Sequence, residues 1–361
     1  MFDERPSREA VDFQKEILGR VSRTFALTIP ELPQELGLVV GNAYLLCRIA
    51  DTIEDEPQLP AERKSEFHRD LNRVLANQED VNAFTLRLSS ALRQATASEK
   101  ELVQRLPLVM QVTASTQAAV RETVARCLGI MCEGMPFFQR TVSLQGLATL
   151  DELDRYCYYV AGVVGEMLTD LFCLHSDTIA ARRSQLMPLA VSFGQGLQMT
   201  NILKDFWEDR ARGTCWLPRD VFARTGCDLA TLQPNRLNPG FHPAMQQLIA
   251  VAMRHLHNAL SYSLLIPRKE TGIRRFCLWA IGFAVLSLRK LNQSPDFTTG
   301  SEVKISRRAV RGVTRAVHFS VRNDWMLRWL FHLSSRGLPD LPADLCVVTP
   351  LDGKPHWSQT D

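Results

Sequence analysis

The sequence has no long apolar run, little net charge and no leader-like start. Its longest apolar stretch, residues 276–288, is bracketed by basic pairs and is shorter than the roughly 20 residues that a membrane span needs, so we expect a buried core helix there. The net charge of +3 is too small to indicate nucleic-acid binding. The charged first residues lack the apolar segment of a signal peptide. These features favour a cytoplasmic protein that binds no nucleic acid.

Patterns of metal-binding or disulfide-bonded cysteines are also missing. The nine cysteines are scattered, odd in number and contain no C-x-x-C pair. The eight histidines show no H-E-x-x-H motif or other paired ligand spacing. Neither a zinc site nor a disulfide framework is therefore indicated, and we expect reduced thiols.

Strand signals are almost absent, since no repeated period-2 runs with hairpin turns occur. Apolar residues instead recur at the 3.6-residue spacing of helices. The pattern predicts an all-α protein with helices at about 8–20, 35–55, 61–77, 80–94, 98–110, 115–134, 150–173, 180–210, 242–265, 270–292, 304–318 and 322–334. Turn-rich stretches are expected to interrupt helices at 56–60, 134–136, 218 and 233–240.

No stretch has the length or low complexity of an interdomain linker. We therefore predict one all-α domain over residues 1–338, followed by a loosely ordered tail at 339–361 that contains four prolines. Residues 325–331 form an amphipathic segment that either packs on the protein's own core or contacts a membrane surface. The oligomeric state is not indicated by any feature.

Two acidic motifs stand out within the apolar helices. They are Asp51-Thr-Ile-Glu54-Asp55 and Asp205-Phe-Trp-Glu208-Asp209, each with acids at i, i+3 and i+4. This spacing puts three like charges on one helical face, where they repel unless solvent or cations compensate. Carboxylates without histidine or cysteine partners suit a hard cation such as Mg²⁺. The motifs predict sites for several Mg²⁺ ions and a diphosphate, the alternative being solvated helix faces.

Polar stripes extend from both motifs. One consists of Tyr44, Arg48, Asp51 and Asp55, and the other of Gln198, Asn201, Asp205, Asp209 and Arg212. Basic residues beside the motifs would share the charge of a diphosphate leaving group; they are Arg48, Lys204, Arg210 and Arg212. A separate G-x-G at 194–196 lacks both a preceding strand and the third glycine, which excludes a Rossmann site there.

Four segments together resemble the squalene/phytoene synthase family. They are Ser22-Arg23-Thr24-Phe25, residues 44–55, residues 156–165 and residues 198–209, and they occur in the family's order. The resemblance implies an all-α isoprenoid-synthase fold with a central cavity between the two acidic helices. Lys204 stands where the family usually has arginine, which keeps the charge but loses the bidentate fork.

Within this family, the segments Phe276-Cys277 and Val303-Lys304-Ile305 resemble squalene synthases. The resemblance implies head-to-head condensation of two farnesyl diphosphates, followed by NADPH-dependent reduction to squalene. Ser306 departs from the family's Val-Lys-Ile-Arg stretch, with Arg307 beside it. The alternatives are a phytoene or dehydrosqualene synthase, which does not reduce its product, and a non-catalytic relative acting in assembly, which would be expected to lose the acidic motifs.

The resemblance also implies roles for single residues. The Mg²⁺ ligands would be Asp51, Glu54, Asp55, Asp205, Glu208 and Asp209, and Tyr156 would assist proton removal with Tyr44 facing the same cavity. Phe276 would line the second half-site, where an aromatic face stabilises a cation, or would simply pack in the core. Contacts to diphosphate or NADPH would come from Arg23, Arg48, Asn201, Lys204, Arg212, Lys304 and Arg307.

Overall fold

The computed structural model describes residues 1–340 apart from 23, 142 and 235–237. Contacts group the chain into two compact units, Met1–Arg140 with Glu166–Ala181 (unit 1) and Thr141–Gly165 with the chain from Arg182 onward (unit 2). The single domain predicted over residues 1–338 stays a prediction, since each unit is described by itself. Most of the predicted tail, from residue 341 onward, lies outside the described residues.

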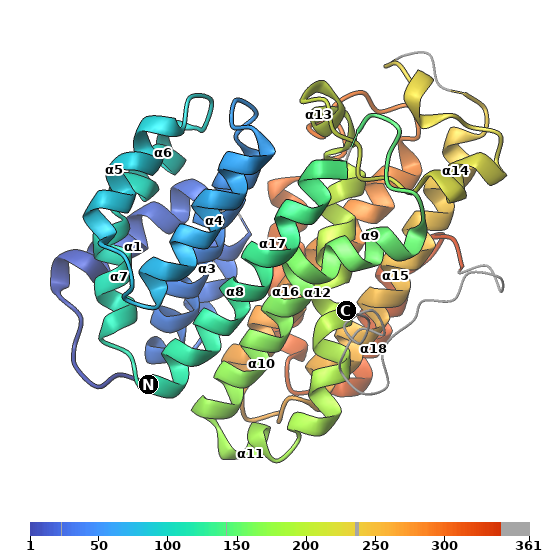
Figure 1. Ribbon diagram of the computed structural model, residues 1–361. Coiled ribbons are helices and arrows are strands. Elements are labelled where there is room, and N and C mark those ends of the chain that lie inside the picture. Colours follow the sequence, from blue (N-terminus) through green and yellow to red (C-terminus); the bar gives the residue numbers. More distant parts are fainter. Residues whose placement is uncertain (23, 142, 235–237, 341–361) are drawn as a thin grey trace. The chain divides into compact units, whose positions relative to one another are not determined.

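Unit 1 is built around α3 (Gln34–Asp55), which packs against α1, α4, α6 and α7 (Figure 1). The side chains of Leu45, Ile49 and Ile53 on α3 are fully buried, as their spacing predicts. The other elements assigned to this unit are α1 (Arg8–Val21), α2 (Phe25–Thr28), η1 (Ile29–Glu31), α4 (Ala61–Leu75), α5 (Val81–Ala91), α6 (Ala97–Gln104), α7 (Leu106–Ala114), α8 (Ala118–Thr141), most of α10 (Val163–His175) and α11 (Asp177–Ala180).

Unit 2 is built around α12 (Arg183–Lys204), which packs against α15 (Phe241–Leu265), α16 (Thr271–Gln293) and the π-helical turn η2 (Tyr158–Gly162) (Figure 1). Its remaining elements are α9 (Leu150–Cys157), α13 (Phe206–Ala211), α14 (Arg219–Arg224), η3 (Leu229–Thr231), α17 (Arg307–Ser320) and α18 (Asp324–Ser335).

The all-α prediction is confirmed for the part of the chain that the structure describes. Apart from helices, it contains two isolated β-bridges, Phe2 with Thr116 and Leu147 with Pro218. Helix starts follow local capping chemistry: the side chains of Asp80 and Thr149 each accept a hydrogen bond from a free backbone N–H of the first turn. The eight described cysteines are all free thiols, as expected.

One predicted helix end is wrong. The Gly134–Pro136 stretch does not break the chain, because α8 continues through Pro136 to Thr141. Proline lacks the N–H of one helical hydrogen bond. Burial on both sides of it compensates, since Met135 and Phe138 are almost completely inaccessible to solvent.

Other predicted helices are subdivided. The 98–110 helix divides at Arg105 into α6 and α7, with Pro107 in the first turn of α7. The 150–173 helix contains the π-helical turn η2, and the 180–210 helix becomes α12 and α13. Apolar periodicity does not distinguish a continuous helix from helices joined by one non-helical residue, which explains these differences.

The expectation that the chain has no membrane-spanning helix is not supported by the length and composition of its helices. Within the described residues, three stretches have sufficient length and apolar character: Gln34–Asp55, Leu150–His175 and Thr271–Gln293. The predicted core helix at 276–288 is thus the centre of a helix of 23 residues. Of their most apolar windows, 72%, 50% and 61% respectively are buried inside the protein.

Candidate active site

The first acidic motif occupies the last turn of α3. Asp51 and Asp55 are one turn apart, and the Asp51 side chain is 34% exposed. Glu54 instead turns inward and is 7% exposed; its carboxylate accepts a hydrogen bond from Gln139 Nε2 at 3.0 Å. The three acids therefore do not share one environment, and the prediction that Glu54 binds metal together with the aspartates stays a prediction.

Burial dominates the electrostatics of this motif, and neighbouring carboxylates add to its effect. Burial raises the pKa of Asp51 to about 7; Arg48 opposes the shift, and the charges of Asp55 and Glu99 add to it. Burial likewise raises the pKa of Glu54 to about 8, with a further contribution from Asp55. Negative charge at this end of α3 is thus incompletely compensated by the protein's own cations.

Arg48 lies in the predicted stripe and is bonded to Glu99, which belongs to α6 and is remote from Arg48 in the sequence. Its Nη2 donates to Glu99 Oε1, and its Nη1 lies 3.9 Å from Asp51 Oδ2. Glu99 is positioned by a capping box with Thr96 at the start of α6. The capping pattern is readable from the sequence, but the pairing with Arg48 is not, and our sequence reasoning missed Glu99.

Tyr44 packs on the segment that precedes α3. Its hydroxyl donates to the Val21 carbonyl at 3.3 Å, and its ring centroid lies 5.1 Å from that of Phe25. Burial raises the pKa of the Tyr44 phenol. Position 23, where the predicted Arg23 stands, lies outside the described residues.

The second acidic motif spans a helix junction. Helix α12 ends at Lys204, Asp205 has the non-helical angles φ −96° and ψ 14°, and α13 begins at Phe206. The expected continuous helical face is therefore interrupted at Asp205. Lys204 Nζ lies 3.1 Å from Asp205 Oδ2 and donates to Asn201 Oδ1 at 3.3 Å. Burial raises the pKa of Asp205, and Lys204 opposes that shift.

Two further acids complete this motif with different partners. Asp209 Oδ1 accepts from Arg212 Nη2 at 2.9 Å, and both residues belong to the predicted stripe. Glu208 Oε1 accepts from the backbone N–H of Gly300 at 2.8 Å, while its Oε2 is buried without a hydrogen-bond partner. As for Glu54, metal binding by Glu208 stays a prediction.

The loop around Gly300 closes against this motif. A Cβ atom at position 300 would lie 3.0 Å from Asp205 Oδ1 and 3.2 Å from Glu208 Oε1, so only glycine fits without displacing them. Sequence reasoning missed this contact, because Gly300 is about 90 residues away from the motif along the chain. The loop leads directly into the predicted cofactor segment at Lys304.

That segment precedes α17, and both Lys304 and Arg307 are exposed. Ser306 is the N-cap of α17, and its hydroxyl accepts from Ala309 N at 3.1 Å. The departure from the family's arginine thus has a local structural reason. Because the start of a helix offers free N–H groups, this basic end of α17 is able to bind a phosphate.

Arg210 was expected to share the charge of a diphosphate because it lies beside the second acidic motif, but its contacts are with the protein's own backbone. Its guanidinium donates to the carbonyl oxygens of Leu229 at 2.8 Å and Leu232 at 3.0 Å. It also lies over the Phe206 ring, 5.7 Å from the centroid. Arg210 therefore fixes the loop after α14, and a diphosphate contact is not supported.

Tyr156 lies near the end of α9, is 4% exposed and stacks on Trp216 with ring centroids 3.9 Å apart. The glycines that follow it serve close packing: a Cβ at Gly165 would lie 2.1 Å from the Ala190 carbonyl oxygen of α12. Phe276 is 5% exposed within α16. Catalytic roles for Tyr156 and Phe276 stay predictions.

A buried polar network adjoins the Tyr156 helix. Ser192 Oγ lies 2.8 Å from His255 Nδ1 and accepts from Asn258 Nδ2 at 2.9 Å. On its other side, His255 Nε2 lies 3.4 Å from Asp154 Oδ1. These contacts connect α9, α12 and α15 through the buried side chains of Asp154, Ser192 and His255, so the network helps to hold α9 in place.

The donor set of the acidic motifs fits Mg²⁺ delivered with a diphosphate. Among the described residues, no three histidine, cysteine, aspartate or glutamate side chains are grouped to hold a metal ion alone. Mg²⁺ commonly takes one or two carboxylates and completes its shell with water and substrate phosphates. The raised pKa of Asp51 and the unpartnered Glu208 Oε2 are consistent with such sites.

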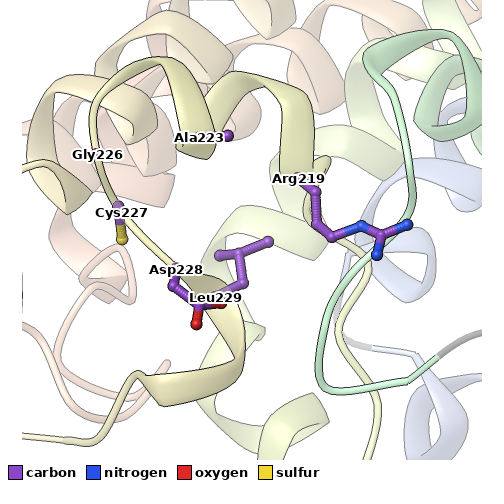
Figure 2. A pocket seen from close by; sticks show the side chains of 6 residues that line it. All are labelled: Arg219, Ala223, Gly226, Cys227, Asp228 and Leu229. Atoms are coloured by element: carbon purple, nitrogen blue, oxygen red, sulfur yellow. The ribbon is translucent and has the colours of Figure 1, made fainter.

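A pocket of about 330 Å³ lies elsewhere in unit 2 (Figure 2). Figure 2 shows Arg219 on α14 and Cys227 and Asp228 on the segment that follows it. No predicted site residue lines this pocket, whose walls are Arg219, Ala223, Gly226, Cys227, Asp228 and Leu229. We therefore do not assign it to the candidate active site.

Comparison with known proteins agrees with the motif assignment. The family model described as squalene/phytoene synthase matches residues 18–309. A squalene synthase of Gibberella zeae is 28% identical over 81% of this chain and 61% of its own length. One of Eremothecium gossypii is 30% identical over 73% of this chain and 58% of its own length. The chain thus spans about three fifths of these relatives.

Solved structures show the same fold. A ligand complex of TcSQS matches with a TM-score of 0.73 and 23% identity, covering 91% of this chain and 92% of that one. A dehydrosqualene synthase in complex with a ligand matches with a TM-score of 0.65 and 20% identity, covering 87% and 97%. At these identities the likeness establishes the fold, which is the predicted isoprenoid-synthase fold.

Proposed function

The chain belongs to the squalene/phytoene synthase family, and from that premise we propose that it condenses two farnesyl diphosphates head to head and reduces the product to squalene. The main support for this proposal is the pair of acidic motifs. The first lies beside Arg48, and the second lies beside Lys204 and Arg212. The names of the curated relatives favour squalene as the product. The enzyme would be a transferase of isoprenoid biosynthesis.

The reaction has two halves. One farnesyl diphosphate loses its diphosphate, and the resulting carbocation alkylates the double bond of the second molecule. Loss of a proton then closes a cyclopropane and yields presqualene diphosphate. In the second half, departure of the remaining diphosphate, rearrangement and hydride transfer from NADPH yield squalene.

Four aspartates are the proposed Mg²⁺ ligands, namely Asp51, Asp55, Asp205 and Asp209. Glu54 and Glu208 remain in the proposal as supporting acids, because one oxygen of each already accepts a hydrogen bond from the protein. When bound, Mg²⁺ would draw negative charge from the departing diphosphate. The basic residues would bind the same group through charge-assisted hydrogen bonds.

Arg48, Lys204 and Arg212 are the proposed diphosphate-binding cations, each lying next to one of the proposed ligands. Asn201 orients Lys204 through its side-chain oxygen. Arg23 stays in the proposal on the family match alone.

Tyr156 and Tyr44 are the proposed residues for proton removal, which a phenol near diphosphate oxygens can relay. The stacking of Tyr156 on Trp216 would fix the orientation of its ring. Phe276 would present an aromatic face to a passing cation and exclude water.

Lys304 and Arg307 are the proposed contacts for an NADPH phosphate. Support comes from their exposure at the basic start of α17 and from the loop at Gly300, which attaches this segment to the second acidic motif. NADPH use, the number of substrate molecules, a cytoplasmic location and peripheral membrane contact all belong to the proposal.

Product analysis tests the function. Purified protein is incubated with farnesyl diphosphate and Mg²⁺, with and without NADPH, and the products are identified by gas chromatography and mass spectrometry. We expect squalene only with NADPH. Dehydrosqualene formed equally with and without NADPH, or turnover of a C20 diphosphate alone, would instead identify a phytoene or dehydrosqualene synthase.

A further inference from the structure

Helix α18 exposes an apolar face. Four of its side chains are 71%, 37%, 50% and 42% exposed; these are Trp325, Met326, Trp329 and Leu333, which we call the aromatic face. Trp325, Trp329 and Leu333 follow one another at intervals of four residues, so they form one stripe along the helix. Two tryptophans that each expose half or more of their side chain on the same helix are unusual for a surface that contacts only water.

The opposite side of α18 is firmly attached to unit 2. Leu327 is 3% and Phe331 7% exposed, and the Phe331 ring lies 4.8 Å from that of His257. At the start of the helix, Asp324 accepts from Arg268 Nη2 at 2.6 Å and from the fully buried Arg274. The aromatic face therefore belongs to a helix whose other side is packed against unit 2.

The charge around α18 is strongly positive. Residues 302–340 contain eight lysines and arginines, all of them exposed, against three acids, Glu302, Asp324 and Asp340. The charge of Asp324 is already paired with Arg268 and Arg274. Three exposed arginines lie before, within and directly after α18, namely Arg322, Arg328 and Arg336. This concentration contrasts with the net charge of +3 for the whole chain.

We propose that the aromatic face of α18 docks on anionic lipid bilayers. Tryptophan side chains favour the boundary between headgroups and acyl chains, and exposed arginines are attracted to anionic lipid headgroups. A polyanion such as nucleic acid would match the arginines but would leave the leucine and methionine exposed to water. The inference rests on the peripheral membrane contact named in the proposed function and assigns its surface. It can be tested separately from the catalytic activity, because none of these residues belongs to the candidate active site.

Vesicle binding of the full chain tests the apolar part of the proposal. Binding is measured by co-sedimentation with vesicles of phosphatidylglycerol and phosphatidylcholine and with vesicles of phosphatidylcholine alone. We expect clear binding to the anionic vesicles and about tenfold weaker binding by the Trp325→Ser/Trp329→Ser variant. Leu86→Ser is the matched control, since Leu86 is 70% exposed on α5, and this variant should bind like the unmodified protein.

Charge variants test the electrostatic part. Each of Arg322→Gln and Arg328→Gln should weaken binding to anionic vesicles about fivefold at low salt, whereas Arg8→Gln, whose side chain is 95% exposed on α1, should not. Circular dichroism verifies that every variant is folded. Equal binding by the unmodified protein and the tryptophan variant, equal binding to neutral vesicles, or a dimer in gel filtration that the tryptophan variant abolishes would overturn the proposal.

Discussion

Asp51 and Glu54 lie three residues apart on α3 and nevertheless have different surroundings. The Asp51 side chain is 34% exposed and lies 3.9 Å from Arg48, whereas Glu54 is 7% exposed and bonded to Gln139. Positions three apart share one side of a helix, so helical geometry alone does not explain the difference. The cause is tertiary packing, because Gln139 of α8 contacts Glu54. An aspartate at the solvent boundary is the better candidate for a cation that arrives with substrate.

Replacing Asp51 tests this assignment at the level of one atom. Asp51→Asn keeps the size of the side chain and removes its charge, so turnover of farnesyl diphosphate should fall about 100-fold or more. The helical circular-dichroism signal should stay unchanged. Asp12→Asn is the control, because the Asp12 side chain is 62% exposed on α1 and its pairing with Arg8 contributes little. Unchanged turnover in the Asp51 variant would contradict the metal assignment.

Neighbours of the motif residues on the same helix were predictable from the sequence, whereas neighbours from other elements were not. The pairs Arg48–Asp51 and Asp209–Arg212 were accessible to prediction because the two members of each pair are three residues apart in the sequence. Glu99 and Gly300 were not, because they reach the motifs from elements far away in the sequence. Helical spacing describes neighbours on one helix, while contacts between helices depend on packing.

At the scale of elements, the junction between α12 and α13 carries the second motif. One non-helical residue, Asp205, separates the helices, and the loop at Gly300 closes over it. The periodicity predicted one helix here because both halves bury apolar residues in phase, including Ile202 and Phe206. Similarly, Ser306 looked like a lost cofactor contact in the sequence and is the N-cap of α17 in the structure.

The attachment of α18 supplies a prediction of stability. Asp324→Asn would leave Arg274, which is fully buried, without its charged partner, and should lower the free energy of unfolding by about 3 kcal/mol. Urea unfolding at pH 7 measures the loss. Asp296→Asn, at an exposed position after α16, is the control and should change little.

The same variant should alter the dependence of stability on pH. Burial alone would raise the pKa of Asp324, but hydrogen bonds from Arg274 and Arg268 outweigh it and lower the pKa below the ordinary value of 3.8. A carboxyl group with a lowered pKa in the folded state stabilises the protein above its unfolded pKa, and this contribution is lost as the pH falls further. The difference between the two proteins should therefore be full above about pH 5 and shrink below pH 4. A constant difference over this range would refute the ion pair.

At the scale of the whole molecule, the all-α class and most helix bounds were predictable, because amphipathic periodicity is a local property. The helix predicted at 242–265, for example, is Phe241–Leu265 in the structure. The grouping of helices into two compact units was not predictable in this way, since it depends on contacts between residues far apart in the chain. The family motifs added what periodicity lacks, namely the chemistry of the two acidic segments.

We propose that this chain makes squalene by reductive head-to-head condensation. The most direct test of this proposal is the mass of the product formed from farnesyl diphosphate, Mg²⁺ and NADPH that carries deuterium at the transferable position. Because one hydride is transferred, the proposal requires squalene that is one mass unit heavier than squalene made with ordinary NADPH. An unlabelled C30 product, formed at the same rate without NADPH, would contradict it.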